Sequence, residues 1–157
     1  MKLGEALREL KRLQNKLVRK INLRESTFYI TKDKPSVISY EEITEEIARL
    51  TIEIRILKLN IEFTNNTQFI EVNGKSMSIA EIIIRMGDLK SELKQNGSLL
   101  KIRRFSFEKE DESKVPQKNE LEMHQIVEKL EKEKEDLDRI LQKSNWIWEL
   151  KQQKDNY

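Results

Sequence analysis

The sequence predicts a mainly α protein, an antiparallel helical bundle or coiled coil of about four helices with a small inserted β-hairpin. Charged residues make up 37% of the 157 residues, and only 4 Gly and 2 Pro interrupt them, a composition typical of long helices. Apolar residues recur at spacings of three and four along most of the chain, which is the helical period. A chain of this length is expected to form one helical domain over 1–157.

The helix expected over 40–63 carries two apolar seams. The first contains Ile43, Ile47, Leu50, Ile54, Leu57 and Ile61; the second contains Ala48, Ile52, Ile56, Leu59 and Phe63. The seams are two positions apart, which is roughly 200° around a helix. A helix that is apolar on two sides has to be covered on both. We therefore expect a homo-oligomer, with Ile52, Ile56, Leu59 and Phe63 at its interface.

Three further helices follow from the same period. Leu3, Leu10 and Leu17 are seven residues apart and predict a helix over 3–21. The pair Ser78 and Glu81 forms a capping box that starts a helix over 79–95, which Asn96-Gly97 should stop. Gly87 within it suggests a close backbone approach. A long amphipathic helix is expected over 117–153.

The remaining segments are shorter or lack the helical period. Asn73-Gly74 between two β-prone runs predicts a type I′ hairpin over 68–77. Residues 22–38 are expected to form a long, partly extended connection, and residues 108–116 a loop or linker. The mixed apolar and basic stretch Leu99–Phe107 could add a strand to the hairpin.

Composition excludes several classes of function. The chain has no cysteine, which rules out disulfides, thiolate metal sites and a cysteine nucleophile. Its longest apolar runs are far shorter than the roughly 20 residues that span a bilayer. No metal-binding spacing, phosphate-binding glycine loop or catalytic motif is present, and His124 is the only histidine. We expect a cytoplasmic protein that is not an enzyme, with no metal, no cofactor and no membrane partner.

Three groups of residues are candidates for binding, each with an alternative role. The cations Lys101, Arg103 and Arg104 beside Phe105 suit a phosphate and a base, or they edge a small sheet. The side chains of Asn65, Asn66 and Thr67 could converge on a ligand, or they could cap a helix. Trp146 and Trp148 could stack on a ligand, although anchoring of a neighbouring subunit is favoured.

Nucleic-acid binding is a less favoured possibility. It would use the basic residues of the first helix: Lys11, Arg12, Lys16, Arg19 and Lys20. The net charge of +2 does not by itself imply a polyanion partner.

Short motifs near both ends and in the middle of the chain resemble the septicolysin-like family of small uncharacterised bacterial proteins. These are Met1-Lys2-Leu3-Gly4-Glu5-Ala6-Leu7, the Thr64-Asn65 break before Gly74-Lys75-Ser76, and Leu137-Asp138 through Asn145-Trp146 to Glu149-Leu150. The resemblance implies an α-helical, oligomeric protein with no established activity. The residues that would carry over have no assigned role in the family; they are Glu5, Asn65, Gly74, Arg85, Asn145 and Trp146. We add Arg85 to the candidate ligand-binding residues.

The leading functional hypothesis is a non-enzymatic oligomeric binding protein that sequesters a small anionic, nucleotide-like ligand in pockets between subunits. Small oligomeric proteins that sequester nucleotide signals, some of them made by phages, provide an analogy. A structural or adaptor coiled coil that binds a partner helix is the alternative. A membrane-active cytolysin, which the family name implies, is disfavoured because a chain without cysteine cannot be activated through a thiol.

Overall fold

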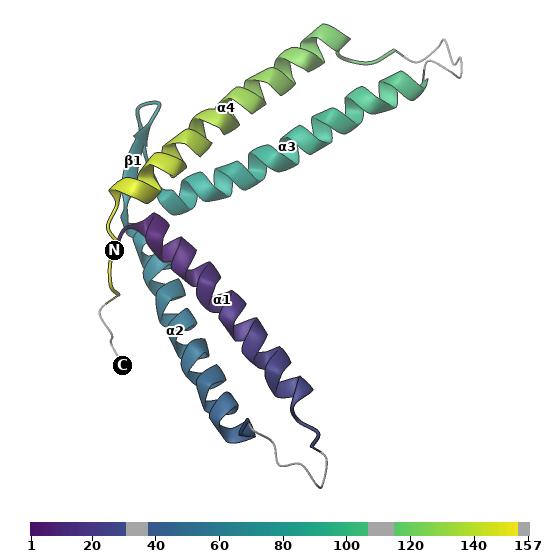
Figure 1. The fold of residues 1–157 in the computed structure, drawn as a ribbon. Helices are drawn as coiled ribbons and strands as arrows, with labels where there is room; N and C mark the ends of the chain where they lie inside the picture. Colours follow the sequence, from purple (N-terminus) through teal and green to yellow (C-terminus); the bar gives the residue numbers. More distant parts are fainter. Residues whose placement is uncertain (31–37, 107–114, 154–157) are drawn as a thin grey trace. The chain divides into compact units, whose positions relative to one another are not determined.

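In a computed structural model, which describes residues 1–30, 38–106 and 115–153, the chain is mainly α with one small antiparallel sheet. The element order is α1, α2, β1, β2, α3 and α4 (Figure 1). This confirms the predicted fold class. The chain divides into two compact units, unit 1 with residues 1–68 and 144–157 and unit 2 with residues 69–143. The single domain expected over 1–157 stays a prediction.

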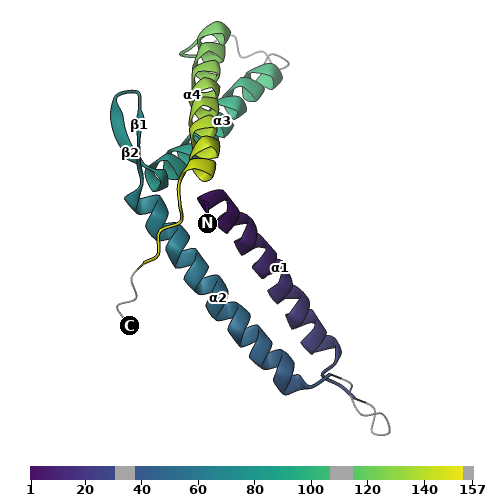
Figure 2. The ribbon, with the colours of Figure 1, turned by 60° about the vertical axis from the view of Figure 1, so that its left-hand side comes forward.

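Unit 1 contains a hairpin of two long helices, α1 (Leu3–Ser26) and α2 (Tyr40–Thr67), which lie side by side in Figures 1 and 2. The first seam predicted for α2 faces inward, because all of its residues except the half-buried Ile47 are buried. Leu3, Ala6 and Leu13 of α1 are buried as well. Beside this core, Glu46 Oε1 and Oε2 pair with Lys16 Nζ at 3.1 Å and Lys20 Nζ at 2.6 Å. The two ammonium groups, Lys20 foremost, lower the pKa of Glu46.

Both helices run further than the sequence predicted, so the bounds 3–21 and 40–63 were wrong. Residues 22–26 continue α1 instead of opening an extended connection, and residues 31–37 lie outside the described ranges. In α2 the polar residues 64–67 do not break the helix. Thr64 and Thr67 donate their hydroxyls to the carbonyls of Asn60 and Phe63, four residues back. Such side-chain bonds allow polar residues to remain helical.

The segment 148–153, here called the C-terminal strap, closes one end of unit 1. Lys2 and Glu149 form an antiparallel bridge, in which Leu3 N donates to Trp148 O and Leu150 N donates to Met1 O, both at 2.9 Å. Carboxylate oxygens of Glu149 lie 2.7 Å from Lys2 Nζ and 3.1 Å from the terminal amine. The Lys2 ammonium and then the terminal amine lower the pKa of Glu149.

The strap also reaches the end of α2. Lys151 N donates to Thr64 Oγ1 at 2.9 Å, and Lys151 Nζ donates to Thr67 O and Oγ1. An ammonium group at a helix C-terminus is favourable because the last carbonyls carry partial negative charge. Further along, Gln153 N donates to Asn60 Oδ1 at 3.0 Å. The strap therefore connects the first turn of α1 with the last turns of α2.

Thr64→Val should loosen this connection. Thr64 is completely buried and its hydroxyl both donates to Asn60 O and accepts from Lys151 N. Valine keeps the shape and leaves the Lys151 amide without this acceptor, so the free energy of unfolding should fall by about 1–2 kcal/mol in chemical denaturation. Thr51→Val is the control, because exposed Thr51 bonds only within α2. Equal stability of the two variants would contradict the role given to Thr64.

Unit 2 begins with the predicted hairpin, whose strands are β1 (Phe69–Val72) and β2 (Lys75–Ser78). Phe69 pairs with Ser78 and Val72 with Lys75, which leaves a two-residue turn. Both turn residues, Asn73 with φ 51° and Gly74 with φ 76°, have positive φ, as a type I′ turn requires. The capping box of the next helix is complete, since Ser78 N donates to Glu81 and Glu81 N donates to Ser78.

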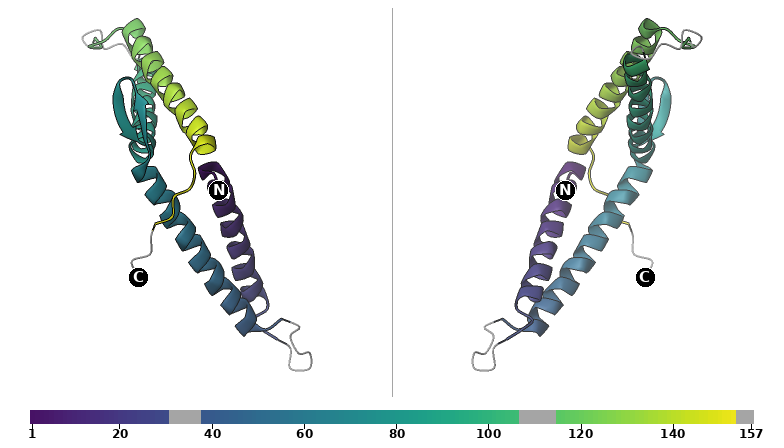
Figure 3. Two further views of the ribbon diagram at one scale, coloured as in Figure 1. Left: turned by 90° about the vertical axis from the view of Figure 1, so that its left-hand side faces the viewer. Right: turned by 90° about the vertical axis from the view of Figure 1, so that its right-hand side faces the viewer.

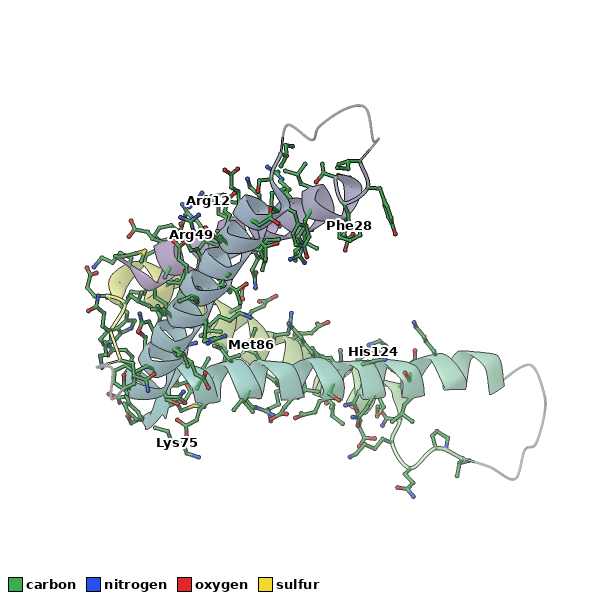
Figure 4. All side chains as sticks on the ribbon, turned by 90° about the horizontal axis from the view of Figure 1, so that it is seen from below. Arg12, Phe28, Arg49, Lys75, Met86 and His124 are labelled. Carbon is green, nitrogen blue, oxygen red and sulfur yellow. The ribbon has the colours of Figure 1, made fainter. Side chains whose placement is uncertain are left out.

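The core of unit 2 lies between the hairpin and two long helices, α3 (Ile79–Ser106) and α4 (Glu120–Ile147, whose last four residues belong to unit 1). Figure 1 shows α3 and α4 next to each other, Figure 3 shows the same two helices from the side, and Figure 4 labels Met86 on α3. The buried cluster is formed by Val72, Ile82, Met86, Leu89 and Leu137. Ile82, Met86 and Leu89 follow one another at gaps of four and three, which places them on one face of α3.

Several expectations for these helices were wrong. The helix α3 passes through Asn96-Gly97, where Asn96 and Ser98 bond back to helical carbonyls, so it does not stop at residue 95. The backbone over 99–106 is helical and adds no strand. Gly87 is exposed, and a Cβ there would meet nothing within 4 Å, so no close backbone approach explains this glycine.

The bounds 117–153 of the last helix also required correction. It starts after Asn119, which exchanges hydrogen bonds with Glu122 as a capping box, and it ends at Ile147 because residues 148–150 bond to the N-terminal segment. Of the predicted linker 108–116, only Val115 and Pro116 lie within the described ranges.

Candidate functional site

The predicted ligand-binding residues fall into both compact units. Asn65, Asn66 and Thr67 belong to unit 1, whereas Arg85 and residues 101–105 belong to unit 2.

The polar group at the end of α2 is largely engaged in local structure. Asn66 Nδ2 donates to Glu62 O at 2.8 Å. Thr67 Oγ1 donates to Phe63 O and accepts from Lys151 Nζ. Asn65 is half-buried. These hydrogen bonds fit the alternative role of this group, a polar helix end. The C-terminal strap is an additional partner that the periodicity of the sequence could not reveal.

Arg85 connects the two helices of unit 2. Its Nε and Nη2 donate to Glu133 at 2.8 and 2.9 Å, and its Nη1 donates to Glu92 at 2.6 Å. The pairing lowers the pKa of Glu133 and raises the pKa of Arg85, chiefly through the bond to Glu133. A planar guanidinium matches a carboxylate in this two-point way. An anionic ligand at Arg85 would have to displace two carboxylates.

The basic and aromatic group at 101–105 lies on the last two turns of α3. Lys101 is exposed, and the side chains of Arg103, Arg104 and Phe105 lie outside those that the structure describes. The alternative role, basic residues edging a sheet, is excluded here because this backbone is helical. Cations near a helix C-terminus also interact favourably with the helix dipole.

The predicted interface residues on α2 form an exposed apolar face. Ile52 is 53% exposed, Ile56 52% and Leu59 40%, while Phe63 is half-buried. The second seam of α2 is thus open to solvent in the single chain.

The two tryptophans lie at the junction of α4 and the C-terminal strap. Trp146 is 52% exposed, and the guanidinium carbon of Arg8 lies 4.4 Å from its ring centroid, a favourable cation–π distance. Trp148 is half-buried, and its carbonyl accepts from Leu3. Trp148 therefore has a part in the closure of unit 1.

A basic depression on α1 includes three of the residues that the sequence offered for nucleic-acid binding: Arg12, Lys16 and Arg19. This shallow surface feature is lined by Arg12, Asn15, Lys16 and Arg19; Arg12 is labelled in Figure 4. Two of the three cations already have carboxylate partners, Arg12 with Glu9 at 2.6 Å and Lys16 with Glu46 at 3.1 Å.

Within the described ranges, no group of three or more metal-ligating side chains is close enough to hold a metal ion. His124 is exposed, and its Nε2 lies 3.7 Å from Glu120 Oε1 on the same helix. Among the same residues, no helix is long and apolar enough to cross a membrane.

Comparisons with known proteins bear on the fold. No family model and no curated protein matches the chain, so the septicolysin-like resemblance stays a prediction. The structure is similar to the crystal structure of a functionally unknown conserved protein from Corynebacterium diphtheriae, with a TM-score of 0.79 and 21% sequence identity over 96% of this chain and 99% of that one. This likeness shows a shared fold.

Proposed function

We propose that the protein is a non-enzymatic helical binding protein that functions as a homo-oligomer in the cytoplasm. The observation that carries the proposal is the exposed face of α2, where Ile52, Ile56 and Leu59 lie on successive turns and are each at least 40% exposed. Single exposed apolar side chains are ordinary, whereas a contiguous apolar face rimmed by polar residues marks an interaction surface. The cytoplasmic location rests on the sequence alone.

The proposed ligand is a small anion of nucleotide type, held in pockets between subunits. The proposal is supported by cations on the surface of both units, namely the basic depression on α1 and the cations at the end of α3, of which Lys101 is exposed. Arginine suits phosphate because its planar fork of donors matches phosphate oxygens.

Native mass spectrometry of freshly purified protein tests the proposed homo-oligomer and the proposed ligand together. We expect a mass of two or more chains, accompanied by a small ligand. Calorimetry with a panel of nucleotides should then show binding that Arg104→Ala or Arg19→Ala weakens, while Lys90→Ala, at an exposed lysine of α3, leaves it unchanged. A single-chain mass at every concentration, with no nucleotide bound, would refute the proposal.

An adaptor that binds a helix of another protein is the second candidate, because the exposed α2 face also suits an amphipathic helix. The adaptor hypothesis predicts that the purified protein is a monomer and that it forms a stoichiometric complex with one partner protein. The hypothesis of a membrane-active cytolysin rests only on the family resemblance and remains disfavoured.

A further inference from the structure

We propose that the exposed face of α2 pairs with the same face of a second copy, antiparallel and about a two-fold axis midway between Ile56 and Leu59. The inference rests on the proposed homo-oligomer and adds the interface, the direction and the register.

The apolar pattern of this face is self-complementary. The four large apolar residues of this face follow one another at gaps of four, three and four, a series that reads the same in both directions: Ile52, Ile56, Leu59 and Phe63. A two-fold interface requires such a surface, because each patch meets its own copy in reverse. In this register Ile56 faces Leu59 of the second copy, and Ile52 faces its Phe63.

The charges beside the seam select the same register. Arg55 and Glu62 lie on one flank of the seam, seven residues apart, and both are exposed. Neither forms an ion pair with any residue in the described ranges. When Ile56 faces Leu59, Arg55 of each copy lies opposite Glu62 of the other, which gives two symmetric ion pairs. Flanking charges of this kind set partner and direction in coiled coils.

The other flank is compatible with the same pairing. It places Glu53 opposite Asn60 of the second copy. Asn60 uses its Oδ1 to accept from Gln153, so its amide nitrogen remains able to donate to that carboxylate. The C-terminal strap bonds to this flank and leaves Ile56 and Leu59 exposed.

A parallel arrangement lacks these contacts. It would place Arg55 opposite Asn60 and Glu62 opposite Thr67, because flanking positions of opposite sides meet in a parallel pair. No ion pair would then form at either place. Charge complementarity therefore favours the antiparallel pair, in which each α2 is covered by α1 on one side and by the second α2 on the other.

Reversing the charges tests the register. In sedimentation equilibrium, Arg55→Glu and Glu62→Arg should each weaken dimerisation by about tenfold or more, since each change places like charges together twice. The double variant, with both charges exchanged, should regain wild-type affinity to within about threefold. Lys58→Glu is the matched control, because Lys58 is also an exposed cation of α2 but projects away from the partner; its effect should be small.

Cross-linking tests the register independently, in a chain that has no cysteine. When equal amounts of Ile56→Cys and Leu59→Cys chains are mixed and oxidised, the mixed disulfide should exceed the two homodisulfides taken together, because random pairing would already make it equal to their sum. A wild-type oligomer with no such preference and no rescue by the charge exchange overturns this interface while the proposed homo-oligomer stands. A wild-type chain that is monomeric throughout overturns both.

Discussion

Leu50→Glu should unfold the α1–α2 hairpin, whereas Ile56→Glu should leave it folded and abolish dimerisation. Leu50 is 4% exposed in the inner seam and Ile56 is 52% exposed on the outer face. A carboxylate at position 50 would be buried without a partner, which costs several kcal/mol and is comparable to the whole stability of a small domain. At position 56 the same charge meets solvent in the single chain and an apolar surface only in the dimer.

Circular dichroism and light scattering distinguish these outcomes. We expect Leu50→Glu to lose much of its helical signal, and Ile56→Glu to keep that signal while its mass falls to one chain. If both variants remain folded at the wild-type mass, the inner seam is not the core that its burial indicates and the outer seam is not an interface.

Gly4→Ala should destabilise the junction of α1 with the end of α4, by about 1–3 kcal/mol, which is typical when atoms are forced into a packed site. Gly4 is buried, and a Cβ there would lie 2.9 Å from the carbonyl oxygen of Asn145. That oxygen belongs to the backbone, so the clash cannot be relieved by turning a side chain.

Gly87→Ala is the matched comparison and should have the opposite sign. It makes the same chemical change within a helix, at a position with open space around it, so alanine should stabilise by about 1 kcal/mol through its better helix propensity. Thermal unfolding of the two variants measures both effects. A Gly4→Ala protein as stable as Gly87→Ala would mean that α1 and α4 do not approach as closely as the structure indicates.

Sequence periodicity predicted the parts of the fold that depend on neighbouring residues. The inner seam of α2, the turn at Asn73-Gly74 and the capping box at Ser78 could be read from residue type and spacing, because each is determined within a few positions of the chain. The exposed outer seam was also visible in the sequence, although its partner was not.

The errors have a common physical origin in contacts that local rules do not contain. Asn96-Gly97 reads as a helix stop, yet Asn96 bonds back to Glu92 and α3 continues. The last helix was predicted to extend to residue 153, yet the chain leaves the helix at Ile147 because Leu3 and Met1 provide backbone partners for Trp148 and Leu150. Arg85 illustrates the same point for the candidate site, since its partner Glu133 is 48 residues away.

The C-terminal strap has a consequence for biosynthesis. A ribosome makes α1 and α2 before residues 69–143 of unit 2, and it makes the strap after them. Until residue 151 emerges, the buried hydroxyl of Thr64 lacks the Lys151 amide, and the first turn of α1 lacks the carbonyl of Trp148. The helical hairpin of unit 1 is therefore translated before unit 2, but its hydrogen bonds to the strap can form only after unit 2 has been translated.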